Sequence, residues 1–203
     1  MGGTMTAEPL PGASTGRWPM PPQDGCTVDD FLSLPDLPPH TELVDGSPVF
    51  VGPQRNLHAP TPYLPEHGLR ATVPEHYRVR RETVVVLTDR TAPEPDLCVL
   101  RAGAVRSRRQ ARFEAEDVVL AVEVVSPESE ERDRDTKPHK YARAGIPHFW
   151  RVEMTGENDD PVVCVHELDT VTGSYGVTGI HHDRLRLTVP YDVDIDLAAI
   201  DHM

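Results

Sequence analysis

The chain has 203 residues, of which 38% are hydrophobic, and its formal net charge at pH 7 is -13. This length and composition suit one globular domain with a core of its own. No apolar stretch approaches the roughly 20 residues of a membrane-spanning helix, and no basic segment with an apolar signal core opens the chain. We therefore expect a cytoplasmic protein without a membrane partner. The acidic net charge argues against any partner whose binding would require a broad basic surface on this protein.

The first 25 residues contain five prolines and five glycines and show no apolar periodicity. This composition predicts a disordered N-terminal tail, followed by a single domain over residues 26 to 203. The three cysteines are Cys26, Cys98 and Cys164, and none of them forms a CxxC pair. Neither a disulfide framework nor a zinc knuckle is therefore predicted.

The early part of the domain contains signals for a short helix and a hairpin. Thr27 and Asp30 resemble a capping box ahead of a short apolar helix face that Pro35 ends. Residues 42 to 51 contain Asp45-Gly46 between two apolar runs, which predicts a β-hairpin. Residues 56 to 74 should be irregular, because Pro60, Pro62 and Pro65 interrupt them and each interior proline costs a helix about 3 kcal/mol.

The rest of the chain is predicted to be mostly strands. Strands are expected over residues 77–81, 83–88, 96–100, 118–125, 148–152, 162–168 and 185–189, and a helix over 132–144. The run 118–125 is the most apolar of them, so we expect it to be the central strand of the sheet.

Glu123 lies inside this apolar run. A carboxylate at such a position costs several kcal/mol unless it meets a cation, pairs with a basic side chain or stays protonated. Asp96 follows Pro95 at the head of an earlier strand, and the two carboxylates could converge at one end of the sheet. An edge-facing or ion-paired Glu123 and an Asp96 that merely starts a turn are the plainer alternatives. Paired oxygen ligands of this kind suit Mg²⁺ or Mn²⁺.

Lys137 shares a helix face with Asp133 and Tyr141, at the i, i+4 spacing. The plainer interpretation is a solvated ion pair between Asp133 and Lys137, worth a few tenths of a kcal/mol. Pro138 disfavours helical backbone at Lys137, so the helix should begin or kink there.

A longer pattern resembles the Uma-two family of restriction-endonuclease-like proteins in the PD-(D/E)xK nuclease superfamily. The matching segments are Thr41 to Gly46, Pro95-Asp96, Glu123 to Pro127, Arg132-Asp133, Lys137, Tyr141 and Gly145 to Val152. The likeness covers roughly residues 27 to 198, and its order and length make it specific, whereas each motif alone would not be.

The resemblance implies an α/β (α+β) fold, with a mixed, strand-rich sheet flanked by helices in a single domain. It implies Asp96 and Glu123 as metal ligands, with the backbone carbonyl of Val124 as the third. The superfamily's lysine stands two residues after the glutamate, where this chain has Val125, and the family offers Lys137 on the next helix instead. Glu42 and His58 match further polar positions of the family.

These features lead to two hypotheses from different classes. In the first, the protein is a metal-dependent endonuclease that hydrolyses nucleic acid, with DNA expected over RNA. Asp96 and Glu123 then bind Mg²⁺ or Mn²⁺, Lys137 stabilises the attacking water or the phosphate, and Glu42 assists. In the second, a non-catalytic protein keeps the fold to bind DNA or a protein partner. A homodimer is expected for cleavage of both strands of a duplex.

Overall fold

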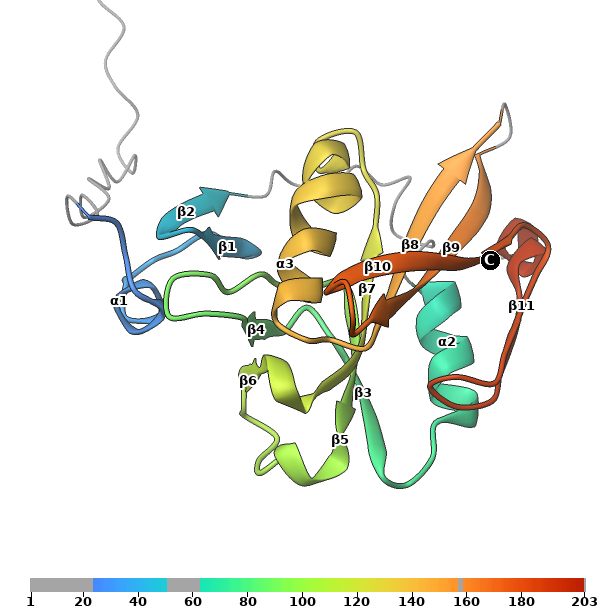
Figure 1. Cartoon of the computed structure of the whole chain (residues 1–203), viewed down its shortest axis with the longest axis horizontal. Helices are drawn as coiled ribbons and strands as arrows, with labels where there is room; N and C mark the ends of the chain where they lie inside the picture. The colour runs from blue at the N-terminus through green and yellow to red at the C-terminus, as the bar shows by residue number, and fades with distance from the viewer. Residues whose placement is uncertain (1–23, 51–62, 157–158, 203) are drawn as a thin grey trace, which may run out of the picture.

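The computed structural model describes residues 24–50, 63–156 and 159–202. All but the last two residues of the predicted tail lie outside these ranges, as does His58. Six strands form the main sheet in the order β10-β9-β8-β7-β5-β3 (Figure 1). Their bounds are β3 (Tyr77–Arg81), β5 (Leu97–Arg101), β7 (Val118–Val124), β8 (His148–Thr155), β9 (Asp160–Asp169) and β10 (Ser174–His181).

The sheet is mixed, because β7 and β8 are parallel and every other pair is antiparallel. A parallel pair needs a crossover, which here consists of a π-helical turn η4 (Arg132–Thr136) and the helix α3 (Lys137–Arg143). The strand β7 lies in the interior of the sheet, between β8 and β5, and all seven of its residues are buried. The prediction of an apolar central strand is thus confirmed.

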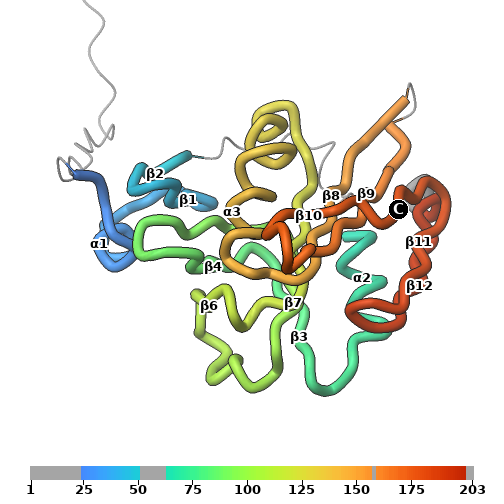
Figure 2. The backbone as a smooth tube through the Cα atoms, viewed as in Figure 1, coloured from blue at the N-terminus to red at the C-terminus, as the bar shows by residue number. Residues whose placement is uncertain are grey.

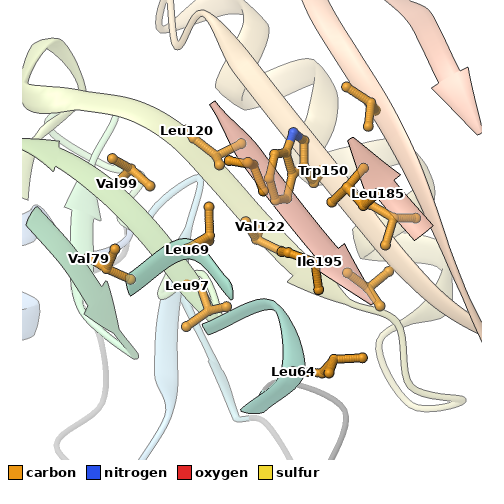
Figure 3. Packing of buried hydrophobic residues seen from close by; sticks show 14 of the residues in the cluster. Leu64, Leu69, Val79, Leu97, Val99, Leu120, Val122, Trp150, Leu185 and Ile195 are labelled. Carbon is orange, nitrogen blue, oxygen red and sulfur yellow. The ribbon is translucent and has the colours of Figure 1, made fainter. Parts of the chain in front are cut away.

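One face of the sheet is covered by α2 (Tyr63–Thr72) and by the hairpin of β11 (Arg184–Leu187) and β12 (Val193–Asp196). Figure 3 shows Leu69 of α2 and Ile195 of β12 packed over Val122 of the sheet. This cluster is the larger of the two cores that lie against the sheet.

The opposite face is covered by α3 and by a two-stranded parallel unit of β4 (Val84–Val86) and β6 (Arg112–Glu114). Alternate residues of a strand point to opposite faces. Val122 and Val124 pack in the first core and Ala121 packs with Tyr141 of α3 in the second. Glu123 therefore points toward α3.

The N-terminal elements form a third, small cluster around Phe31 and Leu43. They are α1 (Val28–Leu32), β1 (Thr41–Val44) and β2 (Ser47–Phe50). The predicted capping box of α1 and the predicted hairpin are both present, and Asp45 and Gly46 of its turn have positive φ. The hairpin lies beside α3 (Figure 2), and Lys140 of α3 pairs with both oxygens of Asp45, each at 2.7 Å.

The expectation of an irregular segment over residues 56–74 is wrong for residues 63–72, which form α2. Pro65 is the third residue of that helix. In the first turn a missing N–H costs nothing, because no carbonyl of the helix is available to accept it. The strands β6, β10 and β12 were not predicted. The remaining elements are short turns of 3-10 helix: η2 (Ala102–Ala104), η3 (Ala115–Asp117) and η5 (Leu197–His202).

The architecture is therefore a strand-rich α+β domain with a large mixed sheet, as the sequence predicted. Within the described ranges, no helix has both the length and the apolar character needed to cross a membrane.

Candidate active site

A small polar cavity of about 40 Å³ lies where the ends of β5 and β7 face the hairpin and the α3 crossover. One water needs roughly 10–15 Å³, so the cavity has room for water or for a hydrated ion. Acidic side chains dominate its lining: Glu42, Glu82, Glu94, Asp96, Glu123 and Asp133, with Lys137, Arg132, His40, Ser126 and Ser129.

The register of two strands brings Asp96 and Glu123 to the cavity. In the antiparallel pair of β5 and β7, Leu97 is opposite Val122. One residue further along the same register, Asp96 is opposite Glu123. Opposed residues in a ladder point to the same face, and both carboxylates line the cavity. The backbone N–H of Val124 donates to Asp96 Oδ2 at 2.7 Å, which fixes the aspartate against the end of β7.

The ammonium of Lys137 lies among three carboxylates. Its Nζ is 2.9 Å from Glu42 Oε1, 3.0 Å from Glu123 Oε2 and 3.2 Å from Asp133 Oδ1. The lysine side chain is 9% exposed, and each of these acidic side chains is 2% exposed. The interpretation of Asp133 and Lys137 as a solvated surface pair is therefore wrong. Tyr141, one turn further along α3, donates its hydroxyl to Glu123 Oε1 at 2.5 Å.

A π-helical turn places Lys137 on the cavity. The Lys137 N–H donates to the carbonyl of Arg132, five residues earlier, and Lys137 has helical backbone angles despite the following proline. Pro138 is in the first turn of α3, where its missing N–H is tolerated. The predicted helix over residues 132–144 thus exists, and the predicted irregularity at Pro138 takes the form of a wider turn directly before α3.

Glu42 reaches the cavity from β1 of the N-terminal hairpin. Its Oε1 accepts the backbone N–H of Glu94 at 3.0 Å and forms an ion pair with the ammonium of Lys137 at 2.9 Å. Its Oε2 is buried and has no hydrogen-bond partner within the described part of the chain. A buried carboxylate oxygen of this kind costs free energy until a donor or a cation meets it.

Burial, and to a smaller extent the neighbouring acidic groups, shifts the pKa values of the carboxylates in this cavity. Burial raises the pKa of Asp96 from 3.8 to about 6, although Lys137 partly opposes this change. Burial also raises the pKa of Glu123 well above its ordinary value, again against the effect of Lys137. Burial alone would lower the pKa of Lys137, but the charges of Glu123 and its acidic neighbours raise it. Lys137 therefore stays charged, but its positive charge does not fully compensate the carboxylates of Asp96 and Glu123.

The donor chemistry of the cavity fits a hard divalent cation. Within the described ranges, no group of three or more His, Cys, Asp or Glu side chains has the geometry to hold a metal ion. Lys137 forms ion pairs with Glu42, Glu123 and Asp133. Mg²⁺ typically uses only one or two carboxylates and keeps several waters. The ligand set predicted from the sequence, two carboxylates and one backbone carbonyl, also has only two carboxylates and leaves positions for water. Buried oxygens with excess negative charge and room for water suit such an ion.

The structure thus places Glu42, Asp96, Glu123 and Lys137, the four residues proposed from the sequence, around one cavity. Sequence reasoning missed Arg132, Glu94 and His40, and it gave Tyr141 and Asp133 no part in the site. The i, i+4 spacing of Asp133, Lys137 and Tyr141 was the sequence signal that could have placed Tyr141 and Asp133 in the site. If this helix face is buried against the sheet, all three side chains lie near Glu123.

A family model described as "Uma2: Putative restriction endonuclease" matches residues 28–198. Since this match spans most of the chain, the protein belongs to the Uma2 family of nuclease-like proteins. Its fold is similar to that in the "Crystal structure of a putative nuclease belonging to DUF820 from Anabaena variabilis ATCC 29413". The TM-score is 0.63 at 17% identity, over 81% of this chain and 89% of the other. No curated protein matches the chain in sequence.

Proposed function

We propose that the protein is a metal-dependent endonuclease that hydrolyses phosphodiester bonds in nucleic acid, with DNA as the expected substrate. The observation that carries the proposal is that the carboxylates of Asp96 and Glu123 line one cavity with Lys137. Membership of a nuclease-like family supports the same reaction class.

In this proposal Asp96, Glu123 and the backbone carbonyl of Val124 hold Mg²⁺ or Mn²⁺. When bound, such an ion lowers the pKa of a water and offsets charge on a phosphate oxygen. The backbone of Val124 holds Asp96 through its N–H, and Tyr141 holds Glu123 through its hydroxyl. Both carboxylates are thereby positioned before any substrate arrives, which lowers the reorganisation needed during the reaction.

Lys137 has two parts in the proposed reaction. Its charge favours the ionised forms of Glu123 and Asp96, and its ammonium orients the attacking water beside them. Glu42 of the N-terminal hairpin forms an ion pair with that ammonium at 2.9 Å. Attack by the water oxygen forms the new bond to phosphorus while the bond to the leaving oxygen breaks; the water loses one proton, and the leaving oxygen takes up one proton from solvent. The products are a phosphate monoester and a free hydroxyl group.

The rival proposal is a non-catalytic member of the family that binds DNA or a protein. It is favoured by Val125 at the place where the superfamily carries its lysine and by the net charge of -13. Cleavage assays separate the two proposals. Supercoiled plasmid and single-stranded DNA are incubated with Mg²⁺, with Mn²⁺ or with EDTA, using wild type, Glu123→Gln and the exposed-site control Glu116→Gln.

The nuclease proposal expects cleavage with either metal, none with EDTA, and a loss of about 100-fold or more only in Glu123→Gln. Cleavage that survives in Glu123→Gln would overturn the assigned site. Metal-independent binding of DNA without any cleavage would favour the rival.

We further propose a homodimer as the unit that cuts a duplex, because two strands need two sites. Sedimentation equilibrium at micromolar concentration, with and without a duplex, tests this proposal. A monomer under both conditions would contradict it.

A further inference from the structure

The cavity that holds the carboxylates has two permanently charged basic side chains, Lys137 and Arg132. Lys137 already pairs with Glu42, Glu123 and Asp133 at 2.9 to 3.2 Å. Its ammonium donates a hydrogen bond to Glu123, and Glu42 and Asp133 lie within ion-pair distance of it, so its charge is already shared among three carboxylates. An incoming anion that met only Lys137 would compete with these buried carboxylates for its positive charge.

Arg132 differs from Lys137 in its partners. Its Nε is buried, yet it has no hydrogen-bond partner among the described residues, and the guanidinium forms no ion pair with any of them. The neighbouring Arg134, by contrast, pairs with Glu130 and Glu153 on the outside of the crossover. A buried donor without an acceptor is uncommon in folded proteins and costs free energy. Arg132 therefore has a donor available for a ligand that enters the cavity.

The π-helical turn explains why Arg132 and Lys137 line the same cavity. In a regular α-helix, residues five apart are separated by about 140° around the axis and face different directions. Here the Lys137 N–H donates directly to the Arg132 carbonyl, so the two residues lie one above the other. Turns of this type occur often at functional sites. The widened turn thus adds a second cation to a cavity that an α-helix would leave with one.

A planar guanidinium matches the oxygens of a phosphate group better than an ammonium does. Ser126 and Ser129, whose hydroxyl oxygens lie 2.9 Å apart, line the same cavity and add further polar groups. We propose that Arg132 is the substrate-binding residue that contacts the phosphate of the nucleic acid, while Lys137 remains with the carboxylates. This inference rests on the proposed nuclease function and names the residue that holds its substrate.

The test compares four proteins: wild type, Arg132→Gln, Arg132→Lys and the matched control Arg134→Gln. Cleavage of a short DNA duplex in Mg²⁺ gives kcat and KM, and fluorescence anisotropy of the same duplex in Ca²⁺ gives Kd. Thermal melting against Mg²⁺ concentration gives metal affinity and reports whether each variant folds. A charge-assisted hydrogen bond lost from a phosphate contact should lower kcat/KM and weaken Kd by about 10- to 100-fold in Arg132→Gln.

Arg132→Lys should recover part of this loss, since it keeps the charge but not the planar donors. Arg134→Gln should stay within about twofold of wild type, and Mg²⁺ affinity should be unchanged in all four. If Arg132→Gln does not fold, the same comparison rests on Arg132→Lys, whose kcat/KM should still fall several-fold below that of Arg134→Gln. Equal losses at positions 132 and 134, or no loss at 132, would overturn the inference.

The two proposals fail in different ways. If wild type cleaves DNA and both Arg132 variants cleave it equally well, the nuclease function is supported and the proposed role of Arg132 is wrong. A wild type that neither cleaves nor binds the duplex removes the nuclease function, and with it this inference.

Discussion

The ammonium of Lys137 lies 3.0 Å from Glu123 Oε2, and this contact joins the first helix residue after the crossover turn to the central strand of the sheet. Glu42 of the N-terminal hairpin binds the same ammonium at 2.9 Å. One lysine therefore holds together three parts of the fold. Removing one partner of a buried ion pair leaves the other charge without compensation.

Replacing Lys137 with methionine should consequently affect both stability and activity. We expect the free energy of unfolding in EDTA to fall by about 3–5 kcal/mol, because three buried carboxylates lose their cation. Cleavage should fall about 100-fold or more, with little change in Mg²⁺ affinity. Urea denaturation and steady-state kinetics measure the two effects.

The matched control for this prediction is Lys140→Met, on the same helix. Lys140 binds Asp45, whose side chain is 73% exposed, so the loss should stay below about 1 kcal/mol. If both variants behave alike, the buried cluster around Lys137 contributes no more than a surface pair.

Tyr141→Phe removes the hydroxyl that donates to Glu123 Oε1 and leaves the ring in place. A hydrogen bond to a charged group contributes about 1.5–3 kcal/mol, so stability should fall by that amount and kcat by about 10-fold as Glu123 loses its orientation. The comparison is Tyr175→Phe, which removes a hydroxyl bonded to the backbone carbonyl of Ile146. That change should lower stability without lowering kcat, and a parallel loss of kcat in both variants would contradict a specific role of Tyr141.

The sequence predicted the elements whose signal is local. The apolar run of β7, the Asp45-Gly46 turn and the Thr27 cap each depend on a few adjacent residues. The strand β10 carries Gly176 and Gly179 and alternates poorly, and it exists because β9 offers a ladder partner. Such strands depend on their ladder partner more than on their own residues, and the residues of the strand alone do not reveal that pairing.

The same distinction applies to the site. Asp96, Glu123 and Lys137 were proposed as site residues from the resemblance and from the cost of a carboxylate in an apolar strand. The partners that complete the cluster come from a π-helical turn and from a hairpin 81 residues before Glu123, where Glu42 lies. A surface pair and a buried triad of carboxylates around Lys137 have the same i, i+4 pattern, so only the packing of α3 on the sheet separates them.

The contact of α2 with β12 supplies a prediction about the fold alone. A Cβ built on Gly68 would lie 2.2 Å from Cγ1 of Ile195, in the core seen in Figure 3. Gly68→Ala should therefore destabilise the protein by about 1–3 kcal/mol through overpacking, even though alanine favours helices. Gly103→Ala is the control, because a Cβ there meets nothing within 4 Å. Urea denaturation should show the loss only at position 68, and an unchanged midpoint for Gly68→Ala would mean that β12 moves aside freely.

Asp96 provides a test that depends on pH. Burial raises the pKa of its carboxyl in the folded protein from 3.8 to about 6. Between these two values the folded protein keeps a proton that the unfolded chain has released. The free energy of unfolding due to this group must therefore decrease as pH rises through the window, by about 3 kcal/mol in total. Asparagine does not titrate and keeps an oxygen that can accept the Val124 N–H.

In EDTA, Asp96→Asn should accordingly match wild type near pH 4 and become more stable than wild type by up to about 3 kcal/mol at pH 7.5. Adding Mg²⁺ at pH 7.5 should stabilise wild type and not the variant, because the ion then supplies the missing positive charge. The exposed-site control Asp183→Asn should show neither effect. Urea denaturation at four pH values, with and without Mg²⁺, measures all three proteins. A constant difference between Asp96→Asn and wild type across this range would show that Asp96 is ionised with its ordinary pKa, and the cation-deficient cavity on which the metal proposal depends would be wrong.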